Sequence, residues 1–250
     1  MAILEGATNQ FRGVVVKPEA LMDSPQEFQE ALNQSVAAWQ SEGLRLVWLE
    51  VPIGNSALIP VAVAAGFEFH HSGADYLMLT RRLIPDAHIP PYASHYIGAG
   101  GVVLRKNRDL LVVCERHRQR GQAPFYKLPG GAILAGEHLA DAVVREVLEE
   151  TGVHTQFDAL VCFRHWHGYR YGKSDIYFVC RLRPLSDQIT MQEEEIEDCL
   201  WMPVDDFLGS EETSVFNKSI VSAALDSPGV SPSRIAGFED GTREFFMPNG

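Results

Sequence analysis

The segment 128–153 constrains this chain most, because a glycine-rich turn stands directly before an amphipathic helix. The turn reads Leu-Pro-Gly-Gly at 128–131, and its two glycines let the backbone bend tightly and approach a metal ion or phosphate closely. In the predicted helix 138–150, apolar residues recur at i, i+4 and i+8 as Leu139, Val143 and Val147. The segment therefore predicts a helix that packs on a core through one side and follows a tight loop.

A second strip of the same predicted helix carries three carboxylates. Glu146, Glu149 and Glu150 stand at i, i+3 and i+4, so they gather on neighbouring turns. Like charges at this spacing destabilise a helix by a few tenths of a kcal/mol per pair, roughly. A divalent cation would offset that repulsion, and oxygen ligands of this kind suit Mg²⁺ or Mn²⁺. The helix by itself favours the alternative, a solvated acidic face, so the decision depends on the residues around it.

The spacing around the helix is distinctive. From Gly131 to Val153 the chain reads glycine, five residues, Glu137, seven residues, Arg-Glu-Val, one residue, Glu-Glu, one residue, Gly-Val. This resembles the Nudix box, GX5EX7REUXEEXGU with U aliphatic, at every fixed position. The resemblance implies an α/β (α+β) protein with a Nudix α/β/α sandwich built on a mixed sheet.

The resemblance also implies a role for each box residue. Glu146 and Glu150 would be the main metal ligands, Glu149 would assist, and the carbonyl of Gly131 or a neighbour would complete the coordination. Arg145 would orient the glutamates, while Glu137 and Gly152 would be structural. Mg²⁺ or Mn²⁺ would neutralise a diphosphate and lower the pKa of the water that attacks phosphorus. A later carboxylate commonly serves as ligand or general base, and Glu195 is the candidate from the acidic run 191–197.

The likeness continues outside the box. The stretches 163–165, 173–180, 182–185, 195–197 and 201–203 resemble the subgroup of plant ADP-ribose/NADH pyrophosphatases and the animal fibroblast-growth-factor antisense Nudix protein. Members of that subgroup carry an N-terminal pre-Nudix domain with an acetyltransferase-like (GNAT) fold. The stretches 48–52, 65–67, 70–71 and 76–79 look like that domain. The resemblance thus covers roughly residues 11–225.

Local signals divide the chain in the same way. We predict a GNAT-like domain at 1–90, a Nudix domain at 91–225 and a tail or loosely docked extension at 226–250, where Ser, Pro and Gly dominate. In the first domain, Ser24-Pro25-Gln26-Glu27 is a capping box that starts a helix. Strands are expected at 11–16 and 44–51, a second helix from Asn55 or Ser56 to about Ala65, and a hairpin at 67–80. The proline-rich stretch 85–91 reads as a linker.

In the second domain the sequence predicts a hairpin, two long strands and a final helix. The hairpin would join 101–105 to 110–115, the strands would cover 160–166 and 174–182, and the helix would cover 214–225.

The net charge and its distribution limit the kinds of molecule that this chain is expected to bind. A net charge of -12 argues against nucleic acid as a bulk partner. Residues 91–184 nevertheless hold 13 basic against 9 acidic residues, which fits a small-molecule polyanion such as a diphosphate. Arginines suited to phosphate and aromatic rings suited to stacking a base are candidates there, with surface charge or core packing as the alternatives. They are Arg116, Arg118, Arg120 and Arg164, and Phe125, Tyr126, Phe163 and His165.

The expected cellular location is inferred from features that the sequence lacks. It has no apolar run of about 18 residues, and residues 1–10 lack the layout of a signal peptide, so no membrane partner is expected. The four cysteines form no CxxC pair and lie in apolar runs, which indicates reduced buried thiols in a cytoplasmic protein.

The predicted function is metal-dependent hydrolysis of the pyrophosphate bond in a nucleoside diphosphate linked to another moiety. The subgroup implies ADP-ribose and/or NADH as substrate, with release of AMP. Open alternatives are an oxidised nucleoside triphosphate, coenzyme A or an inositol pyrophosphate, or a regulatory binding protein that retains the box. Acetyl transfer is disfavoured because residues 1–90 contain no glycine-rich pyrophosphate turn. That domain is expected to be a lid, a wall of the substrate site or a dimerisation element, and the last role would make a homodimer.

Overall fold

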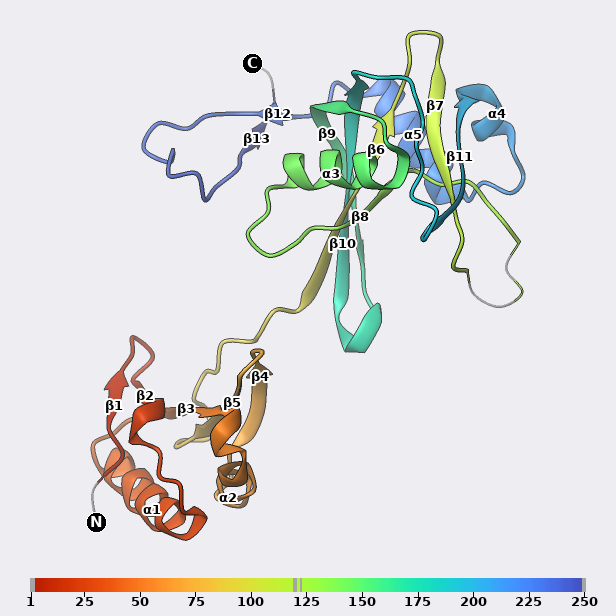
Figure 1. Ribbon diagram of the computed structural model, residues 1–250. Helices are drawn as coiled ribbons and strands as arrows, with labels where there is room; N and C mark the ends of the chain where they lie inside the picture. Colours follow the sequence, from red (N-terminus) through yellow and green to blue (C-terminus); the bar gives the residue numbers. More distant parts are fainter. Residues whose placement is uncertain (1–2, 119–120, 122, 249–250) are drawn as a thin grey trace. The chain divides into compact units, whose positions relative to one another are not determined.

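The computed structural model describes residues 3–118, 121 and 123–248, and the chain divides into two compact units, 1–94 and 95–250 (Figure 1). Unit 1 has its own core, with buried residues from Leu4 to Leu83, and unit 2 has two core clusters of its own. Within the described ranges, no helix combines the length and the apolarity that crossing a membrane requires.

Unit 1 is a five-stranded sheet covered by helices. The strand order is β1-β2-β3-β5-β4, and only β2 and β3 pair in parallel. The elements are β1 (Gly6–Thr8), β2 (Gly13–Val16), η1 (Pro18–Ala20), α1 (Pro25–Ser41), β3 (Leu46–Pro52), η2 (Ile53–Leu58), α2 (Ile59–Ala64), β4 (Glu68–Ser72) and β5 (Tyr76–Arg82). Helix α1 begins where the capping box predicts, because the Ser24 hydroxyl accepts a hydrogen bond from the Glu27 amide.

Two boundaries in unit 1 differ from the sequence expectation. The predicted strand 11–16 starts only at Gly13, because Arg12 takes a positive φ of 54° and turns the chain before β2. The predicted second helix has two parts, the 3-10 helix η2 and the short α2. Pro60 lies in the first turn of α2, the place where a missing N–H breaks no helical bond, so the α-helix starts at Ile59.

Unit 2 is an α/β/α sandwich around a mixed sheet of order β8-β6-β10-β9. Its sheet strands are β6 (His95–Val103), β8 (Gly130–Ala132), β9 (Thr155–Trp166) and β10 (Ser174–Pro184), and β7 (Asp109–Glu115) pairs separately with β11 (Ile196–Pro203). The helices are α3 (Leu139–Thr151), η3 (Arg170–Gly172), α4 (Val204–Gly209) and α5 (Val215–Asp226). Strand β6 runs parallel to β10 and antiparallel to β8. The expected mixed α/β class is therefore confirmed.

Strand alternation supplies the two layers of this sandwich. Val103 packs in the cluster that holds Val143 and Val147 of α3, whereas its neighbour Val102 packs in the cluster that holds Ile220 of α5. Figure 1 shows α3 and α5 on opposite sides of the sheet. The predicted apolar stripe of the box helix is thus the contact that fixes α3 on the sheet.

The predicted hairpin 101–105/110–115 is correct only at its tip. Strands β6 and β7 meet at the isolated bridge between Leu104 and Leu110, and the Arg105 amide donates to the Asp109 carbonyl. Beyond the tip, β6 pairs with β8 and β10, while β7 pairs with β11. The apolar pattern shows that both segments are buried strands, but it does not identify their neighbours.

The final segment of the described chain packs on unit 2. It contains β12 (Ser231–Pro232) and β13 (Phe246–Met247), which pair with each other, and a bridge joins Val230 to Leu160 of β9. The ring of Phe246 lies 5.5 Å from the ring of Phe157. Near the end of the chain, the Glu244 carboxylate accepts hydrogen bonds from the first amides of α3, at Leu139 (2.8 Å) and Ala140 (3.2 Å).

Candidate active site

The loop before α3 approaches its neighbours so closely that only glycine fits. Gly130 has a φ of +148°, and a side chain there would place its Cβ 2.2 Å from the carbonyl oxygen of Ala99. At Gly131 a Cβ would lie 2.5 Å from a carboxylate oxygen of Glu146. The two glycines therefore bring the backbone of β8 against both the sheet and the box helix.

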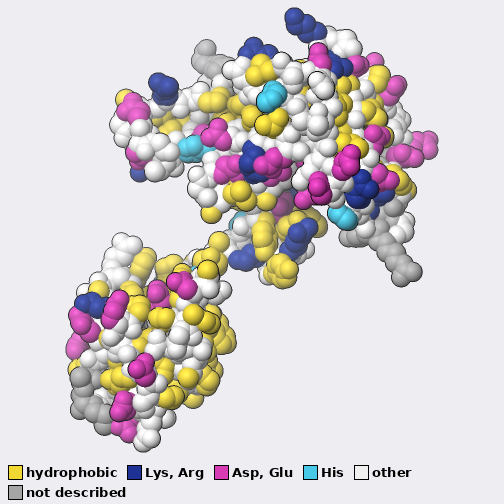
Figure 2. Space-filling model, viewed as in Figure 1, with side chains coloured by type: hydrophobic (Ala, Val, Ile, Leu, Met, Phe, Trp, Pro, Cys, Tyr) yellow, Lys and Arg dark blue, Asp and Glu magenta, His cyan; other side chains and the backbone are white. Residues whose placement is uncertain are grey.

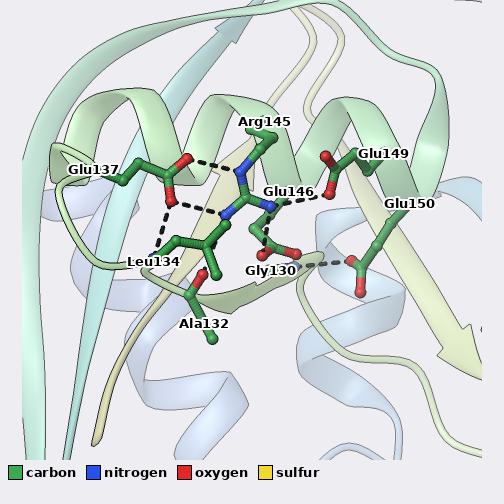
Figure 3. Close-up of polar contacts among 8 residues, drawn as sticks. All are labelled: Gly130, Ala132, Leu134, Glu137, Arg145, Glu146, Glu149 and Glu150. Carbon is green, nitrogen blue, oxygen red and sulfur yellow. Dashed lines mark hydrogen bonds and ion pairs between the residues drawn. The ribbon is translucent and has the colours of Figure 1, made fainter. Parts of the chain in front are cut away.

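Arg145 joins the loop to the helix (Figure 3). Its guanidinium donates to both carboxylate oxygens of Glu137, at 2.7 and 2.9 Å, and to the carbonyl of Ala132. It also donates to Glu146 (2.8 Å) and Glu149 (2.9 Å). The hydrogen bond from Arg145 lowers the pKa of Glu137 below its usual value. A single cation thus offsets part of the repulsion among the helix carboxylates and holds Glu146 in one orientation.

Glu150 is the most constrained carboxylate of the group. It is 7% exposed and accepts a hydrogen bond of 2.8 Å from the Gly130 amide. Burial raises the pKa of Glu150 to about 7, against the opposing effects of Lys127 and the Gly130 amide. Burial likewise raises the pKa of Glu146. Two desolvated carboxylates on one helix are the arrangement that a cation would stabilise.

The side chains of Glu146 and Glu150 line a cavity of about 700 Å³. Glu115, at the end of β7, and Glu195, in the loop before β11, line the same end of it. A smaller cavity of about 230 Å³ adjoins it and shares Gly130, Arg164 and Tyr177 with it. The lining of the smaller cavity includes Phe125, Lys127, Phe216 and Asn217.

One face of the sheet forms the floor of the larger cavity. On β10, Asp175 and Tyr177 stand in register with Tyr96 and Gly98 of β6. On the other side they stand in register with Trp166 and Arg164 of β9, so all these residues share one face. Glycine is needed at position 100 of this face, because a Cβ there would lie 2.0 Å from the Tyr177 hydroxyl. The floor is therefore both polar and closely packed.

Arg164 is the central cation of this face. Its Nη2 donates to Asp175 at 2.6 Å, and its guanidinium lies 5.0 Å from the ring centroid of Phe216. Its Nε is buried without a hydrogen-bond partner in the described structure. Arg164 lines both cavities, so its guanidinium is suited to donate to a substrate oxygen there.

The structure brings together several of the residues expected from the sequence. Gly131, Glu146, Glu150, Glu195 and Arg164 line the larger cavity, and Phe125 lines the smaller one. Gly152 ends α3 in the left-handed region, with a φ of 72°, as its place in the box predicts.

Other expected residues lie elsewhere. Glu149 is 53% exposed and contacts Arg145 on the outer side of α3. The Arg116 guanidinium donates to the carbonyls of Glu193 and Ile196, so it holds the acidic loop. His165 stands in register with Ile176 on the opposite face from Arg164, and its ring nitrogen lies 2.9 Å from that of His95. Arg120 lies outside the described residues.

Three further candidates of the aromatic and basic set have other contacts. Arg118 forms an ion pair with Glu197, and Phe163 is exposed on the sheet face opposite Arg164. A hydrogen bond to Asp198 holds the Tyr126 hydroxyl and raises the pKa of Tyr126 to about 12.

Sequence reasoning missed several lining residues. Glu115 and Lys127 form an ion pair beside Glu150. The larger cavity is also lined by Tyr96, Tyr169, Arg170, Asp175 and Tyr177. Both members of the ion pair could have been found from the sequence, because Glu115 ends an apolar run and Lys127 stands shortly before the Pro-Gly-Gly turn. The strand register that places them is a property of the sheet.

The donor set fits a hard divalent cation. Glu146, Glu150 and the backbone at Gly131 present oxygen atoms at one end of the cavity, and the burial of both carboxylates leaves negative charge without full compensation. In the described part of the chain, no three His, Cys, Asp or Glu side chains converge as a metal-binding group. Arg145 instead holds one oxygen of Glu146.

Comparison with known proteins covers both units. The family model described as the NUDIX domain matches residues 95–223, and the model described as the Nudix hydrolase domain matches residues 4–83. Nudix hydrolase 8 of Arabidopsis thaliana is 39% identical over 210 residues, which are 83% of this chain and 57% of that protein. The chain therefore spans little more than half the length of that relative.

Two more relatives match a larger share of their own length. Nudix hydrolase 2 of Arabidopsis thaliana is 41% identical over 209 residues, covering 82% of this chain and 74% of that protein. The human protein named nucleoside diphosphate-linked moiety X motif 6 is 36% identical over 231 residues, covering 89% of this chain and 72% of its own. Identity at this level over most of both chains shows that this chain belongs to the Nudix hydrolase family.

Proposed function

We propose that this protein is a pyrophosphohydrolase that uses Mg²⁺ or Mn²⁺ to cleave a nucleoside diphosphate linked to another moiety. ADP-ribose and NADH are the leading substrates, and AMP is the shared product. One observation carries the proposal. Glu146 and Glu150 are desolvated at one end of a cavity that also holds a candidate base, Glu195, and a candidate phosphate ligand, Arg164.

Each residue has a distinct task in this proposal. Glu146, Glu150 and the backbone carbonyl at Gly131 would hold the cation, with Glu149 assisting. When bound, the cation neutralises the diphosphate and lowers the pKa of a water. Arg145 keeps Glu146 in place through their 2.8 Å hydrogen bond. Glu195 accepts the proton of the attacking water, and the guanidinium of Arg164 donates to a phosphate oxygen.

The smaller cavity is suited to the nucleoside. Phe125 and Phe216 provide rings for stacking a base, and Asn217, in the first turn of α5, offers both a donor and an acceptor. This cavity meets the larger one at Arg164, next to the carboxylates. A nucleoside bound there would place its diphosphate at the candidate metal ligands.

Unit 1 is assigned a supporting role. Its mixed sheet, with the parallel pair β2 and β3 joined through α1, supports the proposal of a GNAT-like fold. The segment between β2 and α1 contains no glycine, so it has no glycine-rich turn for an acetyl-CoA pyrophosphate. Unit 1 therefore acts as a lid, a wall or a dimerisation element in this proposal.

A substrate panel tests the function. The purified chain is incubated with ADP-ribose, NADH, coenzyme A, an oxidised nucleoside triphosphate and an inositol pyrophosphate, each with Mg²⁺, with Mn²⁺ and with excess EDTA. We expect AMP from ADP-ribose or NADH, only when metal is present. Turnover in EDTA would refute the metal mechanism. Binding without turnover of any compound would favour the regulatory binding protein instead.

A further inference from the structure

The larger cavity has a second end, which the proposed chemistry at the carboxylates leaves unused. Tyr96, Tyr169 and Arg170 line this end, whereas Glu146 and Glu150 line the other. The register of β6 separates the two ends, because Gly100 pairs with Gly130, whose amide contacts Glu150, while Tyr96 lies four residues earlier in the strand. Tyr96 belongs to the sheet face that forms the cavity floor, and Tyr169 lies in the turn between β9 and β10. Figure 1 shows this turn at the end of a long two-stranded ribbon, and Figure 2 shows hydrophobic and basic side chains together there.

Aromatic rings cluster at this end although water reaches them. The ring of Tyr169 lies 5.7 Å from that of Tyr96 and 5.3 Å from that of Trp166, both at tilted or edge-on angles. Tyr96 is 37% exposed and Trp166 is 47% exposed. Exposed aromatic surface beside a cavity is typical of a binding site, and neighbouring rings hold Tyr169 in position.

The turn itself is closed by the backbone. The Tyr169 amide donates to the Lys173 carbonyl at 3.0 Å, and Gly168 and Gly172 both take positive φ values, 77° and 70°. Tyr169 is half-buried, while Tyr171, in the same turn, is 89% exposed and does not line the cavity. The turn therefore directs one of its two tyrosines toward the cavity.

Arg170 adds a positive charge to this end. Its guanidinium lies 5.2 Å from the ring centroid of Tyr169, and it forms no ion pair with any residue that the structure describes. A guanidinium without a carboxylate partner at the edge of a cavity is well suited to donate to oxygen atoms of a bound substrate.

We propose that Tyr96, Tyr169 and Arg170 form the subsite for the moiety on the far side of the diphosphate, and that this subsite favours a moiety with a planar ring that can stack. The inference rests on the proposed function and deepens it. The two cavities meet at Gly130, Arg164 and Tyr177, beside the carboxylates. A diphosphate bound there extends into both, with the nucleoside toward Phe216 and the second ring on Tyr169. A nucleoside triphosphate would leave this subsite empty.

Kinetics on two substrates test the subsite. The kcat and KM for NADH and for ADP-ribose are measured with Mg²⁺ for the wild type, Tyr169→Ala and Arg170→Gln. Tyr169→Ala should lower kcat/KM for NADH about tenfold, through KM, and that for ADP-ribose less than about threefold, because only NADH carries a planar ring on the far side of the diphosphate that can stack. Arg170→Gln should raise KM for both substrates alike, because both carry a ribose on the far side of the diphosphate, and its hydroxyl oxygens can accept from a guanidinium.

Tyr171→Ala is the matched control, since it removes a tyrosine from the same turn without touching the cavity. It should leave all four constants unchanged. Equal losses for NADH in Tyr171→Ala and Tyr169→Ala would overturn the subsite, because the effect would then belong to the turn. Equal effects of Tyr169→Ala on the two substrates would also overturn it.

A binding measurement separates this inference from the proposed function. NADH fluorescence is titrated with the same variants in Ca²⁺. The wild type could bind NADH without cleaving either substrate, and Tyr169→Ala could weaken that binding about tenfold. That result would contradict the proposed hydrolysis and support the subsite. Unchanged binding in Tyr169→Ala, or no binding by the wild type, overturns the subsite.

Discussion

At the scale of single residues, the surroundings of Glu150 decide whether it can act as a metal ligand, more than the fact that it is a glutamate. The same carboxylate on a solvated helix would be an ordinary surface charge. Here it is 7% exposed, bonded to the Gly130 amide, and opposed by Glu146 and Glu115. These contacts make Glu150 costly to ionise without a cation, so its substitution distinguishes a ligand from a surface residue.

Glu150→Gln should separate catalysis from stability. The amide keeps the shape of the side chain and an oxygen that can accept from Gly130, but it removes the charge that holds the cation. The kcat should fall at least about 10²-fold, while the melting temperature stays level or rises because a like-charge repulsion is relieved. Both are measured on one preparation with a verified substrate. A nearly normal kcat would show that Glu150 is not a ligand.

The raised pKa of Glu150 predicts how pH and metal act together. Its folded pKa, about 7, lies above its usual value of 4.5, so without metal its contribution to stability is complete below about pH 4.5 and is lost as pH rises through about 7. A bound cation favours the carboxylate and reverses this loss. The increase in melting temperature on adding Mg²⁺ should therefore grow from about pH 5 to about pH 8.

Thermal unfolding with Mg²⁺ and with EDTA across this pH range measures the effect. Glu150→Gln is the control, because without the titrating group the growth of the metal-induced increase should disappear. If Mg²⁺ raised the melting temperature of the wild type by the same amount at every pH, the assignment of Glu150 as a metal ligand would be contradicted.

At the scale of elements, α3 depends on a residue far away in the chain. His138 stands at the N-cap position but its side chain makes no capping bond, and Glu244 accepts from the Leu139 and Ala140 amides instead. A carboxylate at a helix N-terminus satisfies free amides and interacts favourably with the helix dipole. The box helix is therefore stabilised by residues outside the matched range 95–223.

Glu244→Ala should lower the free energy of unfolding of unit 2 by about 1 kcal/mol, because two amides lose their acceptor. For a unit of this size the melting temperature should fall by about 2–4 °C. Glu239→Ala is a matched control, since Glu239 is exposed in the same segment. Equal, negligible shifts for both variants in calorimetry would show that the cap contributes nothing.

At the scale of the whole molecule, the chain is built from two units with separate cores. Buried residues of the first core end at Leu83, and those of the other two clusters begin at Ala99. All residues that line the cavities with the candidate catalytic groups belong to unit 2. The groups proposed for hydrolysis are thus supplied by one unit.

A fragment of residues 95–250 should therefore fold and retain hydrolysis. Domains with their own core fold independently as a rule, so we expect a kcat within about threefold of that of the full chain. An unchanged KM would favour the dimerisation role of unit 1, and a raised KM would favour the lid or the wall. Circular dichroism confirms folding before the kinetics are read. A folded fragment with strongly reduced activity would show that unit 1 contributes to the substrate site.

The sequence by itself determined the features that depend on local spacing. The segment 128–153 fixes α3, its apolar stripe and the positive-φ glycines 130 and 152, because helix periodicity and positive φ values are properties of consecutive residues. The sequence also indicated Glu146, Glu150 and Glu195, which the structure places at one end of a cavity.

Only the tertiary structure decided which candidates share a surface. Arg164 and His165 are neighbours in the chain, yet strand alternation puts them on opposite faces of the sheet. The antiparallel register of β10 on β9 then brings Tyr177 and Asp175 onto the same face as Arg164. The predicted 101–105/110–115 hairpin forms only at its tip for the same reason, because its two strands pair with other strands beyond that point. Strand neighbours and register are set by contacts between distant segments, which no local pattern records.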